Sequence, residues 1–378
     1  MNLKSLTSRD YIRQLIGLLL LSLSSITNAS TIAQLDSTVS NIAKTFMKDT
    51  GYVGLSVAVN HSGKTIYQQS FGFADQALGI AFDQNTVVGL GSNTKVLTAT
   101  AILQLKDNNK IQLDSAIKNY LPMRVIGDDK ITVRQLLCHT SGLPNVYGEG
   151  EFTDYAWQQA TSMKNIIAKL NTSQQVIKPG EKYSYNNTGY ILLGLITEHL
   201  SGQSLGDYFR DQLFAPLKLQ NSYYLADTVY IENMSKGYKA DNGRAKLFEP
   251  HELTEYRIFQ GAGAVGGTLS DYMRWFSAIA KGELLSDTTT AQMQTPCKLN
   301  SGQDSPEGLG IESNIIAGEK ALNGGGVANG FLSLAYYFPH SDLTIGFVGN
   351  TEADWGAFHR QYYPAVLAWF KTYNKGLK

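Results

Sequence analysis

Strand-like segments at the two ends of this chain enclose a long helix-rich middle, and this distribution limits the possible folds more than any other feature. Near the N-terminus, the apolar and β-branched segment 54–60 is followed by a tight turn and a second strand-like segment, 65–71, which predicts a hairpin. Near the C-terminus, segments 330–338 and 343–348 carry strand signals as well. Because a sheet must bury its apolar face, we expect one sheet built from both chain ends and flanked by helices, with a mostly helical insertion. The predicted fold class is α/β, in the α+β sense.

The helical segments follow from the spacing of apolar residues. In segment 31–49, these residues recur at the spacing of an amphipathic helix. Further helices are expected at residues 188–201, 205–217, 270–281 and 353–372. The last of them contains Pro364, which predicts a kink or a break because proline cannot donate a helical hydrogen bond.

The start of the chain resembles a secretory signal peptide. Lys4, Arg9 and Arg13 form a basic beginning, residues 15–26 form an apolar core, and residues 27–29 offer a small-residue cleavage site. The apolar core is short for a membrane span, which needs roughly 20 residues. We therefore expect an exported protein, periplasmic or secreted, with no membrane span after cleavage. An uncleaved N-terminal anchor is the alternative.

These patterns predict a signal peptide, residues 1–29, and a single domain, residues 30–378. Within the domain we expect a sheet lobe from about 30–105 and 262–378, and a helical lobe from about 106–261. The chain has 32 basic and 32 acidic residues. It therefore lacks the basic field that nucleic-acid binding requires, and no nucleic-acid partner is expected.

The residues with the clearest chemical meaning are Ser92 and Lys95, which precede and open an apolar helix-forming run, residues 96–105. Residues three apart on a helix lie on one face. Unpaired N–H groups in the first helical turn favour a developing oxyanion. A buried lysine that is neutral can accept the serine proton. Taken alone, S-x-x-K more often marks a helix cap followed by a solvated lysine.

Two further motifs lie downstream. Tyr185 and Asn187 form a Y-x-N pattern on a turn that leads into an apolar helix, where residues two apart can point the same way. A phenol and an amide would then face one cleft, although a surface turn with a packed tyrosine is the simpler interpretation of this pattern alone. His139 begins the segment H-T-S-G-L-P, and we expect it to brace a loop rather than to catalyse.

Three motifs occur here in a fixed order: G-S-x-T-K, L-L-x-H-T-S-G-L-P and P-G-x-x-x-x-Y-x-N-x-G-Y-x-L-L-G. Together they resemble those of the serine β-lactamase-related superfamily. That group joins class C β-lactamases, D-alanyl-D-alanine carboxypeptidases, and related esterases and aminopeptidases. The resemblance extends over about residues 32–370. It implies a β-lactamase/transpeptidase-like fold with an antiparallel sheet.

By this resemblance, Ser92 would be the nucleophile that forms an acyl-enzyme. Lys95 and Tyr185 would share the general-base and general-acid work, and Asn187 would position Lys95 and the substrate amide. The backbone N–H of Ser92 would supply half of the oxyanion hole, a donor worth about 2.7–4 kcal/mol. Which of Lys95 and Tyr185 accepts the serine proton stays open at this point.

The remaining motif of this superfamily is a basic residue, any residue and a glycine, with a phenylalanine seven positions after the basic residue. This chain has Asn323, Gly324, Gly325 and Gly326 ahead of Phe331. Seven positions back is Gly324, and a one-residue insertion places Asn323 there instead, so neither alignment supplies a cation. Gly326 or a neighbour would donate the second oxyanion N–H. Because charge-assisted hydrogen bonds are about twice as strong as neutral ones, a neutral ester or amide is favoured over a carboxylate-bearing substrate.

The other patterns carry less chemistry. Cys138 and Cys297 lie far apart in sequence. An exported chain could pair them, but two cysteines are no disulfide framework and sequence cannot give their distance, so we expect two separate thiols. G-x-S-x-G around Ser204 follows a predicted helix, so Ser204 is interpreted as a helix cap and not as a nucleophile elbow. The glycine-rich segment 261–266 lacks a βαβ unit and is expected to bend beside the cleft. No motif indicates a metal or nucleotide cofactor, and none is expected.

The sequence therefore predicts an exported serine hydrolase that acts on an ester or amide through an acyl-enzyme. We rank an esterase or peptidase first, then a D,D-carboxypeptidase or penicillin-binding protein, then a β-lactamase. The expected partner is a small ester or amide, or a cell-wall peptide. The alternative is a non-catalytic protein that keeps the cleft and binds cell-wall or peptidoglycan fragments.

Overall fold

The computed structural model describes residues 30–145, 162–174, 177–227, 230–241, 243–248 and 256–375. The predicted signal peptide, residues 1–29, lies outside them. The chain divides into two compact units: Met1–Met47 with Asp354–Lys378, and Lys48–Ala353. The larger unit contains the central sheet and every candidate site residue.

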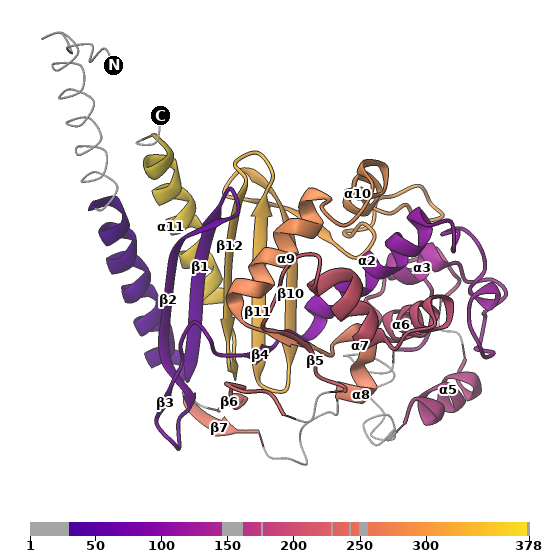
Figure 1. Ribbon diagram of the computed structural model, residues 1–378, viewed down its shortest axis with the longest axis horizontal. Helices are drawn as coiled ribbons and strands as arrows, with labels where there is room; N and C mark the ends of the chain where they lie inside the picture. The colour runs from indigo at the N-terminus through magenta and orange to yellow at the C-terminus, as the bar shows by residue number, and fades with distance from the viewer. Residues whose placement is uncertain are drawn as a thin grey trace, which may run out of the picture. The chain divides into compact units, whose positions relative to one another are not determined.

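The larger unit is built around a seven-stranded sheet in the order β3-β2-β1-β12-β11-β10-β9. Its strands are β1 Gly54–His61, β2 Lys64–Asp75, β3 Ile80–Ala81, β9 Glu312–Ile316, β10 Glu319–Ala328, β11 Phe331–Phe338 and β12 Leu343–Gly349. All neighbouring pairs are antiparallel, and β1 meets β12 with Leu55 opposite Gly349. Figure 1 shows the indigo and yellow strands side by side, which confirms the expected sheet built from both chain ends.

The helices of this unit lie mainly between the two groups of strands in sequence. They include α2 Thr94–Asp107, α3 Val133–Leu137, α5 Met163–Thr172, α6 Asn187–Ser201, α7 Leu205–Tyr208, α8 Tyr256–Phe259, α9 Leu269–Lys281 and α10 Asp287–Gln294. Two three-stranded sheets accompany them, in the orders β13-β6-β7 and β4-β8-β5. Their strands are β4 Val88–Gly89, β5 Ser222–Tyr224, β6 Tyr238–Asp241, β7 Arg244–Leu247, β8 Val265–Gly267 and β13 Thr351–Glu352.

Helix α2 lies in the core and fixes the position of the residues that precede it. Most of its side chains are buried, on every side of the helix, as expected for a helix enclosed by other elements. It packs against α6, while α9 packs against β1, β11 and β12 (Figure 1). The start of α2 is therefore held between the helical part of the unit and the sheet.

One predicted helix and part of the sheet differ from the sequence prediction. Segment 205–217 is α-helical only in α7 and then widens into a π-helical turn, Phe209–Phe214. Pro216 cannot donate the hydrogen bond that a continued helix needs. Strands β9 and β10 were not among the predicted strands. In β10, the run of three glycines at 324–326 has little strand propensity.

The smaller unit contains helical residues 30–47 and α11 Gly356–Lys375. Within it, the rings of Phe46 and Phe358 lie 5.2 Å apart, and the Trp369 indole N–H donates to the Thr31 carbonyl over 2.7 Å. Of the kink or break expected at Pro364, the break is wrong, because α11 continues through this residue. Burial of the aromatic face of α11 offsets the lost backbone hydrogen bond, about 3 kcal/mol. None of the described helices is both long and apolar enough to cross a membrane.

Candidate active site

Ser92 lies in a 3₁₀ turn, Gly91–Asn93, that leads directly into α2. The neighbouring Asn93 is fully buried and anchors this turn. Its amide nitrogen donates to Ser333 Oγ on β11 over 2.7 Å, and its oxygen accepts the Tyr272 hydroxyl of α9 over 2.9 Å. The sheet and α9 thus hold the backbone on which Ser92 stands.

Lys95 lies one helical turn beyond Ser92 and contacts it directly. Its Nζ is 3.0 Å from Ser92 Oγ and donates to the Ala262 carbonyl over 2.8 Å. The side chain is buried, and this loss of hydration lowers the pKa of Lys95 to about 7, although the nearby Glu307 acts in the opposite direction. A substantial fraction of Lys95 is therefore neutral near pH 7.

Tyr185 contacts both Ser92 and Lys95. Its hydroxyl shares a hydrogen bond with Ser92, and its ring centroid is 4.7 Å from Lys95 Nζ. The residue is 40% exposed, so one side of the ring faces solvent. Desolvation nevertheless raises the pKa of the phenol, and the hydrogen bond with Ser92 offsets this only in part. Tyr185 is thus a protonated phenol at neutral pH.

His139 packs against two of the tyrosine rings at this site. Its ring centroid lies 4.5 Å from that of Tyr185 and 4.9 Å from that of Tyr190. Its Nδ1 accepts the backbone N–H of Asn186 over 2.9 Å, and burial holds the pKa of His139 well below its ordinary value. The imidazole is therefore neutral, with its proton on Nε2. These contacts agree with the interpretation that His139 braces a loop.

Glu307 is a pocket residue that sequence reasoning missed. Its Oε1 accepts the Tyr183 hydroxyl over 2.6 Å, and its Oε2 lies 3.6 Å from His139 Nε2. It also shares a hydrogen bond with Glu312, and burial raises the pKa of Glu307 to about 7. No motif marks this glutamate, because it meets Tyr183 only through a contact between residues 124 positions apart.

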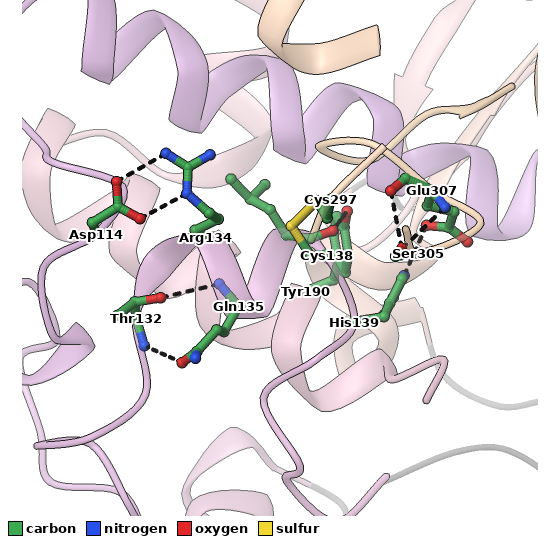
Figure 2. The surroundings of a disulfide bond; sticks show 11 residues. Asp114, Thr132, Arg134, Gln135, Cys138, His139, Tyr190, Cys297, Ser305 and Glu307 are labelled. Atoms are coloured by element: carbon green, nitrogen blue, oxygen red, sulfur yellow. Dashed lines mark hydrogen bonds and ion pairs between the residues drawn. A yellow bond between two sulfur atoms is a disulfide. The ribbon is translucent and has the colours of Figure 1, made fainter. Parts of the chain in front are cut away.

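Cys138 and Cys297 form a disulfide, so the expectation of two separate thiols is wrong. Their Cα atoms are 6.0 Å apart although 159 positions separate them in sequence, a proximity that only the folded chain creates. Figure 2 shows the bond beside His139 and Glu307. Cys138 directly precedes His139, and the Cys297 N–H donates to the Glu307 carbonyl over 2.9 Å. The bond therefore joins two loops that line the same pocket.

The structure places Asn323, on β10, in the pocket. Its side chain is buried, its Nδ2 donates to Glu312 Oε2 over 2.8 Å, and its Oδ1 accepts Asn314 Nδ2 over 2.7 Å. A Cβ at Gly324 would instead lie 2.5 Å from Asn93 Oδ1, inside the protein. The geometry thus matches the alignment with a one-residue insertion. Lys320 is exposed on β10 and does not line the pocket.

The other glycines of this run allow β10 to approach the serine. A Cβ at Gly326 would lie 2.1 Å from the Leu90 carbonyl oxygen and 2.7 Å from the Ser92 nitrogen. No side chain fits there, so the backbone of Gly326 can lie against the serine turn only as glycine. Gly325 lies on the alternate face of the strand and lines the pocket.

Asn187 follows Tyr185 by two positions. It is the first residue of α6, and its backbone N–H donates to Asn145 Oδ1 over 2.9 Å. Its role toward Lys95 stays a prediction.

Ser204 accepts the Asp207 N–H at the start of α7 over 3.1 Å and is a helix cap, as expected. Segment 261–266 bends beside the pocket and supplies the Ala262 carbonyl to Lys95.

One pocket thus contains a serine hydroxyl, a buried lysine, a tyrosine hydroxyl and two carboxyl groups. Its wall includes Ser92, Lys95, Tyr185, Glu307, Glu312 and Asn323. Among the residues that the structure describes, no group of three or more His, Cys, Asp or Glu side chains could hold a metal ion. The fold and this pocket are those of a serine hydrolase. A family model described as Beta-lactamase matches residues 39–367, and the chain belongs to the beta-lactamase family.

Similar proteins agree with this assignment. Penicillin-binding protein 4* of Bacillus subtilis (strain 168) is 26% identical over 325 residues, covering 82% of this chain and 70% of the relative. Teichoic acid D-alanine hydrolase of Staphylococcus aureus (strain MRSA252) is 26% identical over 238 residues, 62% of this chain but only 56% of the relative. A solved penicillin-binding protein from Bacillus halodurans superposes with a TM-score of 0.73 at 26% identity, covering 86% of this chain and 99% of that one.

Proposed function

We propose that the protein is an exported serine hydrolase that cleaves an ester or amide through an acyl-enzyme on Ser92. The observation that carries this proposal is the 3.0 Å contact between Ser92 Oγ and Lys95 Nζ, with the lysine buried and its pKa lowered to about 7. A neutral lysine has a lone pair that can accept the serine proton. A serine hydroxyl alone is a weak nucleophile, and an adjacent base activates it.

In the first step, Lys95 takes the proton of Ser92 while Oγ attacks the substrate carbonyl carbon. The backbone N–H groups of Ser92 and Gly326 would stabilise the oxyanion that forms. Tyr185, whose raised pKa keeps it protonated, then gives its proton to the leaving group and regains one from Lys95. Water then attacks the resulting acyl-enzyme ester, and the same proton transfers occur in the reverse direction. This step releases the acid and restores the Ser92 hydroxyl.

The directions of the two pKa shifts favour Lys95, rather than Tyr185, as the base that takes the serine proton. The pKa of the phenol is raised, so its anion is scarce at neutral pH, whereas neutral Lys95 is abundant. His139 would keep the Tyr185 ring in place through their ring contact. Asn187 would act on the substrate amide, as the family resemblance implies.

Two independent observations support export. The N-terminal residues have the pattern of a signal peptide. The Cys138–Cys297 disulfide is typical of proteins in oxidising compartments such as the periplasm or the extracellular space. A cell-wall peptide or a D-alanyl ester would then be accessible as substrate, in line with the relative named teichoic acid D-alanine hydrolase.

The test is intact-protein mass spectrometry after exposure to a fluorophosphonate and, separately, to a penicillin. We expect fluorophosphonate to label the wild type and Ser204→Ala, a matched control on an exposed helix cap, but not Ser92→Ala. Hydrolysis of p-nitrophenyl acetate should fall at least about 10³-fold in Ser92→Ala. Labelling of Ser92→Ala would contradict the assignment of the nucleophile. A stable penicillin adduct on the wild type would place the protein among penicillin-binding enzymes.

A further inference from the structure

Strands β9 and β10 give the pocket an anionic wall where the family pattern has a basic residue. Glu312 on β9 and Asn323 on β10 are directly opposite partners in the ladder, and both side chains line the pocket that contains Ser92. Asn323 donates to Glu312 over 2.8 Å and thereby holds its carboxylate in place. This pair therefore places a carboxyl group in the wall of the pocket that contains Ser92.

The Glu312 carboxylate can still bind a further donor. Asn323 and Asn314 donate to its Oε2 over 2.8 and 3.4 Å, and Glu307 shares a hydrogen bond with it. A carboxylate offers about four acceptor positions, so these contacts leave room for an incoming N–H group. The residue Glu312 is also partly exposed, whereas Glu307 is buried.

The charges of the other groups that line the pocket also favour a cationic over an anionic substrate group. The described titratable residues of the wall are Lys95, His139, Tyr185, Tyr190, Glu307 and Glu312. When Lys95 is neutral and able to act as the base, none of them is a cation. A substrate carboxylate would then be repelled by Glu312, whereas an ammonium group would be attracted.

We propose that the substrate carries an ammonium group near its scissile carbonyl, and that Glu312, held by Asn323, binds it. This inference rests on the proposed function and adds the substrate class. The ammonium can belong to the acyl part, as in an aminoacyl ester or amide, or to the leaving group, as in an amino-alcohol ester. Glu312 is thus a specificity residue, and Asn323 is a positioning residue for it.

The test compares matched substrates on the wild-type protein at pH 7. Alanine p-nitroanilide, in D and L forms, carries the amine on the acyl side, and its N-acetyl derivative is the neutral match. The ester 2-aminoethyl acetate carries the amine on the leaving side, and 2-hydroxyethyl acetate is its match. We expect kcat/KM to be at least tenfold higher for the amine in one pair, and that pair identifies the side. Equal kcat/KM values within both pairs would overturn the proposal.

Variants then assign the preference to Glu312. Glu312→Gln should lower the amine-to-neutral ratio of kcat/KM at least tenfold, while Glu319→Gln, on β10 outside the pocket wall, should keep the ratio. An unchanged ratio in folded Glu312→Gln would overturn the assignment. Should Glu312→Gln not fold, propylamine is tested as an inhibitor of p-nitrophenyl acetate hydrolysis by the wild type. Competitive inhibition supports the proposal, and its absence at millimolar amine overturns it.

These outcomes are separable from those for the proposed function. A wild type that is not labelled by fluorophosphonate at Ser92 and hydrolyses no ester would end both proposals. Labelling and ester hydrolysis without an amine preference would leave the serine hydrolase intact and remove only the ammonium site.

Discussion

Lys95 and Glu307 are two buried groups of opposite kind whose pKa values are both brought to about 7. Burial lowers the pKa of the lysine and raises that of the glutamic acid, since it disfavours the charged form of each. Glu307 in its charged form stabilises protonated Lys95 and so opposes the effect of burial on the lysine. At the scale of single residues, the glutamate therefore influences how much neutral lysine exists at a given pH.

The first prediction concerns this influence. In the wild type, kcat/KM for a neutral ester should rise with pH through about 7, as Lys95 loses its proton. Glu307→Gln removes the negative charge that favours protonated Lys95, so the rise should move to lower pH. The Gln oxygen can still accept the Tyr183 hydroxyl. Glu283→Gln, which alters an exposed ion pair with Arg274, should leave the profile in place. An unmoved or upward-shifted profile in Glu307→Gln would contradict the coupling.

At this scale, the motifs predicted the residues whose chemistry depends on neighbours in sequence. Ser92 and Lys95 are three positions apart on one helix, and a local pattern is enough to pair them. Tyr185 was predicted from a motif that is local as well, and its hydroxyl shares a hydrogen bond with Ser92. Glu307 and Glu312 belong to no motif, and each reaches the pocket through contacts that only the tertiary fold creates.

Among the elements, strand β10 has the most demanding geometry. Its segment 324–326 lies against the serine turn so closely that side chains are excluded at Gly324 and Gly326. The same glycines obscured the strand in the sequence, because glycine weakens strand propensity. Strands β1, β11 and β12, rich in apolar and β-branched residues, were predicted with bounds close to those observed. Local propensity therefore predicted strands β1, β11 and β12, but it did not predict β10, the strand beside Ser92.

The second prediction tests the close approach of β10. Gly326→Ala places a methyl group 2.1 Å from the Leu90 carbonyl oxygen, so the strand must move away from Ser92. We expect esterase activity to fall at least about 100-fold, as for the loss of an oxyanion donor. The free energy of unfolding should fall by about 1–3 kcal/mol.

Val327→Ala, at an exposed position of the same strand, serves as the control and should change both quantities little. Enzyme kinetics and denaturant unfolding measure the two effects. Wild-type activity in Gly326→Ala would show that the backbone at this position does not contribute to the oxyanion site.

In the molecule as a whole, one covalent bond joins distant parts of the larger unit. The loop of Cys138 follows α3, and Cys297 lies after α10, close to the loop that contains Glu307. Two cysteines without a spacing pattern gave no sign of this pairing. Sequence cannot give the distance between them, since proximity over 159 positions is a property of the finished fold.

The third prediction is that Cys138→Ser and Cys297→Ser each lower the free energy of unfolding by about 2–5 kcal/mol, because a cross-link over a long loop restricts the unfolded chain. Thermal and denaturant unfolding measure this loss, and the wild type treated with reductant should match the variants. The double variant should be no less stable than the single ones. Alkylation of two thiols in the unfolded, unreduced wild type would show that the bond does not form.

The pairing of β1 with β12 has a consequence for the biogenesis of the enzyme. Leu55 on β1 pairs with Gly349 on β12. Because the N-terminal strands are synthesised first, one edge of β1 stays unpaired until almost all of the remaining chain has been made. An unpaired strand edge invites association with other chains. A chain that crosses a membrane from its N-terminus onward therefore stays inactive and prone to aggregation until its last strands emerge. For the exported protein that we propose, translocation as well as folding would then determine when hydrolysis can begin.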